Sequence, residues 1–325
     1  MKLKEGVFDI FRVIASFREF SLIAVLIIFG LFMTVRSNVF LTKANLEAIL
    51  LGLSVEGIIA VGMAILLISG GLDLSVGSTM AFTGVVTGLA LISLKLATVP
   101  AILLGLLAAL SVGLVNGLLV AKLKINPFIT TLGMLITVRG LLLVLAQGKA
   151  VLNLPESFTV VGQGRLFGIQ FPIYVMLFLV IVGDILLRYS RFFRQSYYIG
   201  GNEKAARLSG INVDFVKIFN YCLVSVLAGI AGVMITARFG SSSVTVGTNV
   251  ELRVITAAII GGASLSGGEG SVFGAFLGAL FMAVLANALN LLGVDVYWQN
   301  LVTGLILIVA VVVDVVNERR KANQK

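Results

Sequence analysis

Long apolar segments recur along almost the whole chain and are separated by short polar ones. A helix needs about 20 apolar residues to cross the hydrocarbon core of a bilayer. With windows of that length we predict ten membrane-spanning helices, beginning near Ser21, Leu46, Thr79, Ala97, Pro127, Phe171, Val216, Val254, Val272 and Gln299. The pattern therefore predicts an all-α polytopic membrane protein with a single transmembrane domain over residues 1–325.

Two glycine pairs interrupt this apolar pattern. Gly70 and Gly71 follow the second predicted span, and Gly261 and Gly262 end the eighth, which is short enough for a half helix. Non-helical backbone at membrane depth is tolerated only where protein buries it or where it lines a water-filled cavity. We expect the two pairs to mark gates or cavity walls. By contrast, we expect Gly229 with Gly232, and Gly274 with Gly278, to allow close helix packing.

The segments that begin at the two pairs resemble each other. Aligned without gaps, residues 70–77 and 261–268 share glycine at three positions, leucine at one and serine at one. Such matches also arise by chance in so biased a composition. A true repeat would be parallel under the ten-span count, whereas an inverted repeat would require a re-entrant segment. The polar residues Asp73 and Ser75 either cap the next helix or belong to a translocation path or gate, and Ser264 or Ser266 are candidate caps for the helix at Val272.

Basic residues favour one orientation of these spans. With the N-terminus in the cytoplasm, 16 of the 24 Lys and Arg fall in inner segments and 7 in outer ones, so we predict both termini inside. Basic loops that face anionic lipid account for the net charge of +9 without nucleic acid. Residues 1–19 mix phenylalanine with arginine and are typical of an interfacial helix, not of a cleavable signal.

Composition excludes most kinds of catalytic site. Hydrophobic residues make up 59% of the chain and charged ones only 12%, and the mean hydropathy is +1.10. There is no His, and Cys222 is the single Cys, so His-based triads, CxxC redox pairs and Cys/His zinc sites are excluded. No Walker A sequence is present, so we expect no cofactor or metal on this chain and no ATPase site. Any ATP and Mg²⁺ would belong to a partner.

The largest predicted cytoplasmic loop, residues 188–217, contains the string GGNEKAARLSGINV. Within it Glu203, Ala205, Ala206 and Gly210 resemble the EAA-x3-G signature that permeases of ABC importers offer to their ATPase, with Lys204 inserted after the Glu. The two alanines would allow close approach and the glycine would end a short helix. The alternative is an ordinary solvated loop helix. The coupling residues that this resemblance implies are Gly201, Asn202, Glu203, Ala205, Ala206, Arg207 and Gly210.

Longer strings extend the resemblance over nearly the whole chain. In order and spacing they resemble the permease subunits of ribose-type ABC sugar importers. They are GGLDLSVGS (Gly70 to Ser78), NPFITTLGM with RG (Asn126 to Met134, Arg139, Gly140), GGNEKAARLSGINV (Gly200 to Val213), GGASLSGGEGS (Gly261 to Ser271) and NALNLLGV with YWQ (Asn287 to Val294, Tyr297 to Gln299). The branched-chain amino-acid permeases, a more distant relation, share only the AAR-x-x-GI-like loop.

This resemblance implies a subunit of the bacterial inner membrane that imports a monosaccharide, such as a pentose. It also implies three partners: an ABC ATPase, a periplasmic or lipoprotein sugar-binding protein, and a second permease copy in a homodimer or heterodimer. Besides these, only membrane lipid is expected to bind. Two alternatives remain, an ion-coupled secondary transporter that uses Glu56, Arg139 or Asp73, and an ABC permease for a nucleoside or branched-chain amino acid. A membrane-embedded enzyme is disfavoured by the missing His and carboxylate cluster.

A few polar residues within or beside the spans are further candidates. Glu56 and Arg139 fall at nearly the same depth, so we predict an intramembrane ion pair or a shared polar cavity. Asn287 and Asn290 share a helical face, and Trp298 lies just outside the membrane. Amides suit sugar hydroxyls and aromatic rings suit pyranose faces, so the three are candidates for a translocation path. The plainer interpretation is helix packing for the Asn residues and an interfacial anchor for the Trp.

Overall fold

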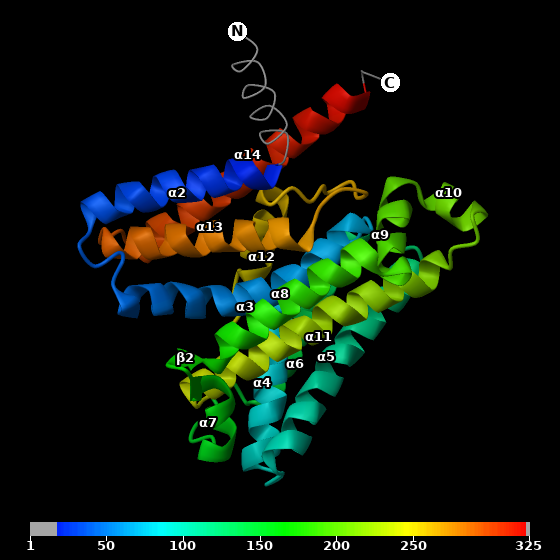
Figure 1. The fold of residues 1–325 in the computed structure, drawn as a ribbon. Coiled ribbons are helices and arrows are strands. Elements are labelled where there is room, and N and C mark those ends of the chain that lie inside the picture. Colours follow the sequence, from blue (N-terminus) through cyan, green and yellow to red (C-terminus); the bar gives the residue numbers. More distant parts are fainter. Residues whose placement is uncertain (1–17, 323–325) are drawn as a thin grey trace.

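The computed structural model describes residues 18–322, and helices make up almost all of their regular structure (Figure 1). Ten helices coincide with the ten predicted spans, each beginning within four residues of the expected start. They are α2 (Arg18–Arg36), α3 (Lys43–Ile68), α4 (Val76–Ile92), α5 (Thr98–Ala121), α6 (Pro127–Leu145), α8 (Phe171–Tyr189), α11 (Val213–Phe239), α12 (Val250–Ile260), α13 (Val272–Leu291) and α14 (Val296–Ala322). The predicted fold class, an all-α polytopic membrane protein, is confirmed.

Short elements lie between the long helices. They are α7 (Glu156–Gln163), α9 (Arg191–Gly201), α10 (Glu203–Leu208) and a small antiparallel hairpin of β1 (Arg165–Leu166) and β2 (Ile169–Gln170). Within the described residues, eight helices are long and apolar enough to cross a membrane. Helix α4 has 17 residues and α12 has only 11, as expected for a half helix. The predicted interfacial segment 1–19 lies outside the described residues except for Arg18 and Glu19, which begin α2.

Helix α3 lies at the centre of the molecule. Its second half, from Gly57 to Ile68, is apolar on all sides, and Ile58, Met63 and Leu66 there have no exposed surface. Helices α8, α11, α12 and α13 pack around it. In contrast, little of α2 or α14 is buried inside the protein, and both lie along one side of the fold (Figure 1). Such exposed apolar helices suit contact with lipid or with another membrane subunit.

Glycines set the closest helix contacts, as predicted. A Cβ added at Gly232 of α11 would lie 2.2 Å from the carbonyl oxygen of Met80 in α4, and one added at Gly278 of α13 would lie 1.9 Å from that of Ala257 in α12. No side chain fits at those distances, so the backbones can approach only through glycine. Gly133, on the exposed side of α6, has no neighbouring atom within 4 Å of the same position.

We therefore expect opposite effects from one substitution at two helical glycines. Gly278→Ala should lower the free energy of unfolding by about 1–3 kcal/mol or more, because the new methyl group collides with backbone. Gly133→Ala should cause no loss, and a gain of up to about 1 kcal/mol is expected from helix propensity. Thermal unfolding of both variants in detergent checks this. Equal stability of the two variants would contradict the close α12–α13 contact.

Candidate functional site

The EAA-like stretch folds into the short helix that the sequence predicted. The side-chain oxygen of Asn202 accepts a hydrogen bond from the Ala205 amide at 3.0 Å and caps the N-terminus of α10. Gly210 follows the helix with a φ of 84°, a left-handed conformation that glycine adopts without strain. Two of the predicted coupling residues thus fix where α10 begins and where the chain turns away from it.

The two faces of α10 differ in chemistry. Ala206 is buried and packs with Ile199, Val213 and Val216 of the neighbouring helices. On the other side Ala205 is exposed, and Leu208 keeps 90% of its surface accessible. A leucine with so little cover, on a helix in a polar loop, suits contact with another protein.

Glu203 ties α10 to its surroundings. Its carboxylate accepts a hydrogen bond from Lys217 of α11 at 2.6 Å and from Arg207, one turn along α10, at 3.1 Å. Lys124, in the loop between α5 and α6, lies 3.6 Å away. The hydrogen bond from Lys217, and then that from Arg207, lowers the pKa of Glu203 to about 2 in spite of its partial burial. Glu203 therefore stays ionised under ordinary conditions.

Asp214, at the start of α11, makes a second set of ion pairs. Its carboxylate accepts hydrogen bonds from Lys122 at 3.3 Å, from Lys124 at 3.2 Å and from Arg207. Loops that are distant in the sequence, around residues 122–124 and 188–217, are thereby joined at one end of the molecule.

The β1–β2 hairpin lies at the opposite end. Arg165 of the hairpin pairs with Glu47 of α3 at 2.8 Å, near α7 and far from α10 (Figure 1). The assignment of the α10 end to the cytoplasm, and of both termini with it, stays a prediction.

The last turn of α9 leads directly to the two glycine breaks. A Cβ at Gly200 would lie 1.9 Å from the carbonyl oxygen of Ile68 and 2.4 Å from the amide nitrogen of Gly268. The Gly268 amide itself donates a hydrogen bond to Ile68 O at 2.8 Å. Gly267 adopts a φ of 86°, and a Cβ there would lie 3.0 Å from the amide nitrogen of Gly70. Residues 68–70, 200 and 267–268 thus form a junction of bare backbone, which we call the glycine junction.

One side chain reinforces the glycine junction. The hydroxyl of Tyr197 on α9 donates a hydrogen bond to the carbonyl oxygen of Gly270 at 2.8 Å. From the sequence we identified each glycine pair separately and missed that Gly200 and Tyr197 bring them together. A third glycine pair, at 200–201, was the signal that could have indicated it.

Asp73 and Ser75 lie in a closed polar cluster. One carboxylate oxygen of Asp73 accepts hydrogen bonds from the Ser75 amide at 2.7 Å and from the Ser75 hydroxyl at 2.6 Å. The side-chain amide of Asn116 on α5 donates to the Ser75 hydroxyl at 3.0 Å. All three residues have no exposed surface. The cluster holds the start of α4 against α5 and does not line an open path.

The expectation that Ser264 or Ser266 caps α13 is wrong. Ser271 is the cap, and its hydroxyl accepts a hydrogen bond from the Gly274 amide at 2.9 Å. Ser264 instead donates to the buried carboxylate of Asp314 on α14 at 3.3 Å. Ser271 directly precedes the helix, so its side chain reaches the first free amides, whereas the earlier serines belong to the loop of the second glycine break.

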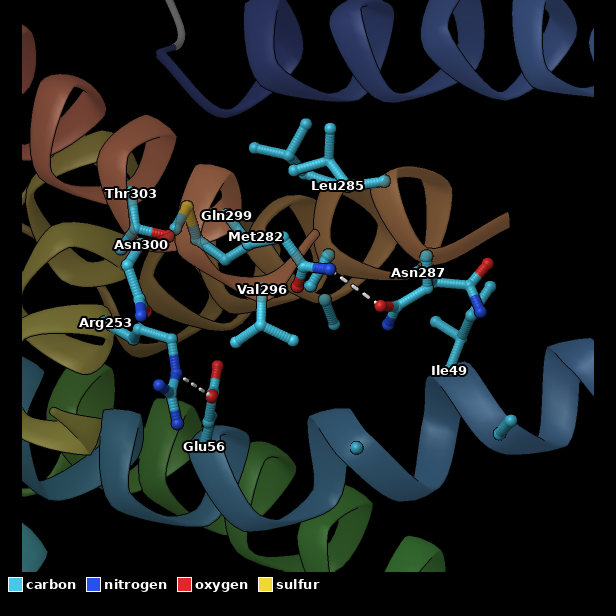
Figure 2. Close-up of a pocket in the computed structure, with 16 residues that line it drawn as sticks. Ile49, Glu56, Arg253, Met282, Leu285, Asn287, Val296, Gln299, Asn300 and Thr303 are labelled. Atoms are coloured by element: carbon cyan, nitrogen blue, oxygen red, sulfur yellow. Dashed lines mark hydrogen bonds and ion pairs between the residues drawn. The ribbon is translucent and has the colours of Figure 1, made fainter. Parts of the chain in front are cut away.

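A polar pocket of about 430 Å³ lies between α3, α12, α13 and α14 (Figure 2). Glu56 faces Arg253 across it, and the Arg253 Nε atom donates to a Glu56 oxygen at 2.5 Å. Asn300 and Thr303 project from the first turns of α14 on the Arg253 side. The pocket lining also includes two of the sequence candidates, Asn287 and Asn290.

The predicted pair of Glu56 with Arg139 is wrong. The guanidinium of Arg139 donates to the carbonyl oxygens of Val244 at 2.8 Å and Val246 at 3.0 Å, while Glu56 pairs with Arg253. The sequence alone places the two residues at a similar depth, but α6, which carries Arg139, packs mainly on α4 and α5. Arg253 lies in the first turn of the short α12, and from there its side chain reaches the pocket.

The remaining sequence candidates lie at or beside the pocket. Asn287 and Asn45 exchange two side-chain hydrogen bonds, at 3.0 and 2.7 Å, across α13 and α3. The Asn290 oxygen accepts a hydrogen bond from the Gln299 amide at 2.7 Å. Trp298 is exposed and outside the pocket lining. Asn287 therefore serves helix packing, whereas Asn290 lines the pocket and uses only its oxygen in a hydrogen bond with another described residue.

Comparison with known proteins identifies the kind of molecule in which these features occur. Residues 45–311 match the family described as the branched-chain amino acid transport system / permease component. The chain belongs to this permease family. The ribose import permease protein of Escherichia coli strain K12 is 39% identical over 90% of the chain and 92% of its own length. No solved structure matches the chain.

Two further relatives carry the names of other sugars. The L-arabinose ABC transporter permease protein of Azospirillum brasilense is 39% identical over 89% of the chain and 86% of its own length. The xylose transport system permease protein of Haemophilus influenzae is 34% identical over 92% and 96%. These matches confirm the resemblance seen in the sequence, and this permease is a multi-pass inner-membrane transport protein of the ABC importer class.

The Glu56–Arg253 pair predicts a specific pattern of coupling. Glu56→Gln and Arg253→Gln should each destabilise the permease, and the double variant should lose less than the sum, with a coupling energy of roughly 0.5–3 kcal/mol. Glu56→Gln combined with Arg139→Gln should be additive, because the two side chains share no partner. Unfolding of the single and double variants in detergent measures both cycles. Coupling to Arg139 and none to Arg253 would refute the pairing seen here.

The low pKa of Glu203 predicts that α10 loosens in acid. A depressed carboxyl pKa stabilises the docked helix fully above the ordinary value of about 4.3, and this contribution is lost as the pH falls towards about 2. Hydrogen exchange of amides 203–210, corrected for intrinsic rates, should show protection decreasing over that interval. Glu203→Gln should show the lower protection already at pH 6, whereas Glu156→Gln, on α7, should not. Unchanged protection down to pH 2 would contradict the assigned role.

Proposed function

We propose that this chain is the permease of an ATP-driven importer and that α10 is the element on which a separate ATPase subunit acts. The observation that carries this proposal is the geometry of α10. It is a short helix outside the spans, fixed on one side by Ala206 and by ion pairs, with Leu208 exposed on the other. A rigid helix with one apolar side chain offered outward suits insertion into a cleft of a partner.

The route by which a push on α10 would reach the membrane is short. Helix α9 ends at Gly201, and Asn202 caps α10 directly after it. The α9 end touches both glycine breaks through the glycine junction, and bare backbone leaves no flexible side chain to absorb a displacement. Rigid-body movement of the α9–α10 unit would therefore shift residues 68–70 and 267–268 together.

The proposed substrate is a neutral monosaccharide, most simply a pentose. Relatives that cover most of the chain are named for ribose, arabinose and xylose, which are all five-carbon sugars. A soluble binding protein, periplasmic or lipid-anchored, would deliver the sugar at the end of the molecule opposite α10. A second permease copy, identical or related, would complete the membrane part, and ATP with Mg²⁺ would be bound by the ATPase.

Ion-coupled transport receives little support from the polar residues that it would need. Among the described residues, Glu56 is paired with Arg253, Asp73 with Ser75, and the Arg139 guanidinium with two carbonyl oxygens. A coupling carboxylate has to exchange its ion or proton with an aqueous path. The Asp73 cluster is closed, so its structural role is favoured.

Leu208→Ser should separate docking from folding. Loss of a fully buried leucine at an interface corresponds to about 1.5–3 kcal/mol, or roughly 10- to 150-fold weaker binding. We expect the variant to lose its co-purifying ATPase and its ATP-driven pentose uptake into liposomes, with an unchanged unfolding temperature. Phe167→Ser is the matched control for ATPase retention alone, because Phe167 is 92% exposed and lies at the end opposite α10. Full uptake without ATP, driven by an ion gradient, would overturn the proposed function.

A further inference from the structure

We propose that the pocket between α3, α12, α13 and α14 is a binding site for one neutral monosaccharide on the permease itself. This inference rests on the proposed function and adds to it a place where the sugar is held after delivery. The pocket lies beside the helices that carry the second glycine break, since α12 ends and α13 begins at that break. It is separate from α10, where the ATPase would act.

The size of the pocket suits a small solute. Its volume of about 430 Å³ lies in the range of about 300–1,000 Å³ that is usual for small-molecule sites. Ile49, Met282 and Val296 supply apolar wall, and polar side chains lie between them (Figure 2). Such a mixture matches a sugar, which has C–H faces and a rim of hydroxyl groups.

Several polar groups in the lining have hydrogen-bonding capacity left over. Among the described residues, the Arg253 guanidinium donates only to Glu56, through Nε, and its terminal amino groups have no acceptor. The side chains of Asn300 and Thr303 make no hydrogen bond with other described residues. The Asn290 amide accepts from Gln299 but keeps both donors. Polar groups between membrane helices need a partner, either water or a ligand.

The charge of the pocket selects against ionic solutes. Glu56 and Arg253 neutralise each other at 2.5 Å, and no other ionisable residue lines the pocket. An amino acid would bring two charges that find no free counter-charge there. Sugar hydroxyls both donate and accept, so they can bond to the guanidinium, to the Asn amides and to the Thr303 hydroxyl without any change of charge.

A single tryptophan makes the site observable. Trp298 is the only Trp of the chain and precedes Gln299, which lines the pocket. We would titrate the full-length permease in a tryptophan-free amphipol with ribose, arabinose or xylose and follow Trp298 emission. Saturation-transfer NMR on the same samples detects bound sugar without depending on the Trp. We expect saturable binding of at least one pentose and none of leucine, which carries two charges.

Two variants test the placement. Asn300→Leu and Thr303→Val should each raise the dissociation constant about two- to tenfold, as expected for loss of one neutral hydrogen bond. Thr137→Val is the matched control, because Thr137 lies on α6, outside the pocket lining, and its hydroxyl bonds within its own helix. We expect its affinity to equal that of the unmodified chain.

The outcomes separate this inference from the proposed function. No saturable pentose signal by either method, binding of leucine in preference to sugar, or equal affinity in all three variants would overturn the pocket assignment. ATP-driven pentose uptake by the complete importer, measured in parallel, tests the proposed function alone. Uptake that persists without any pentose signal from the permease would refute the site and leave the importer assignment standing.

Discussion

The fold depends on satisfying the backbone hydrogen bonds where a membrane helix is interrupted. A break within the hydrocarbon region exposes backbone amides and carbonyls that lipid cannot bond. Here the two breaks satisfy each other, because the Gly268 amide donates to the Ile68 carbonyl. That bond forms only if the two segments come within backbone contact, and a side chain at Gly200 or Gly267 would collide with the backbone there. The arrangement of α3, α12 and α13 follows from this contact.

The same close backbone packing connects the loop of residues 188–217 to the membrane helices. Because Gly200 fits against Ile68 and Gly268 without a Cβ, α9 ends on the two breaks instead of on a layer of side chains. Contacts between side chains have rotamers that can yield, whereas close backbone contacts have none. The ion pairs of Glu203 and Asp214 act at the other end of this unit and hold α10 to α11 and to the α5–α6 loop. A displacement of α10 therefore moves a rigid assembly.

The sequence predicted the fold class, the ten helices and α10 well, because apolar length, capping by Asn202 and the left-handed Gly210 are local properties. The sequence did not predict which residues on different helices contact each other. Depth along a span is a single coordinate, so the sequence places Glu56 and Arg139 at a similar depth, although α6 packs mainly on α4 and α5. The partners Arg253, Asn45 and Asn116 come from distant parts of the chain. Only the packing of helices decides which residues at equal depth meet.

Polarity within a span does not by itself mark a transport path. Asp73 is the most deeply buried carboxylate among the sequence candidates. Its carboxylate oxygens accept hydrogen bonds from Ser75 and Asn116, and none of the three side chains is exposed. Nothing in the sequence distinguishes Asn300 and Thr303, but both line an open pocket and have unused hydrogen-bonding groups. A residue that has satisfied its bonds within the protein stabilises the fold, and a solute gains nothing from it. Unused hydrogen-bonding capacity that faces a cavity is therefore the more informative sign of where a polar solute is held.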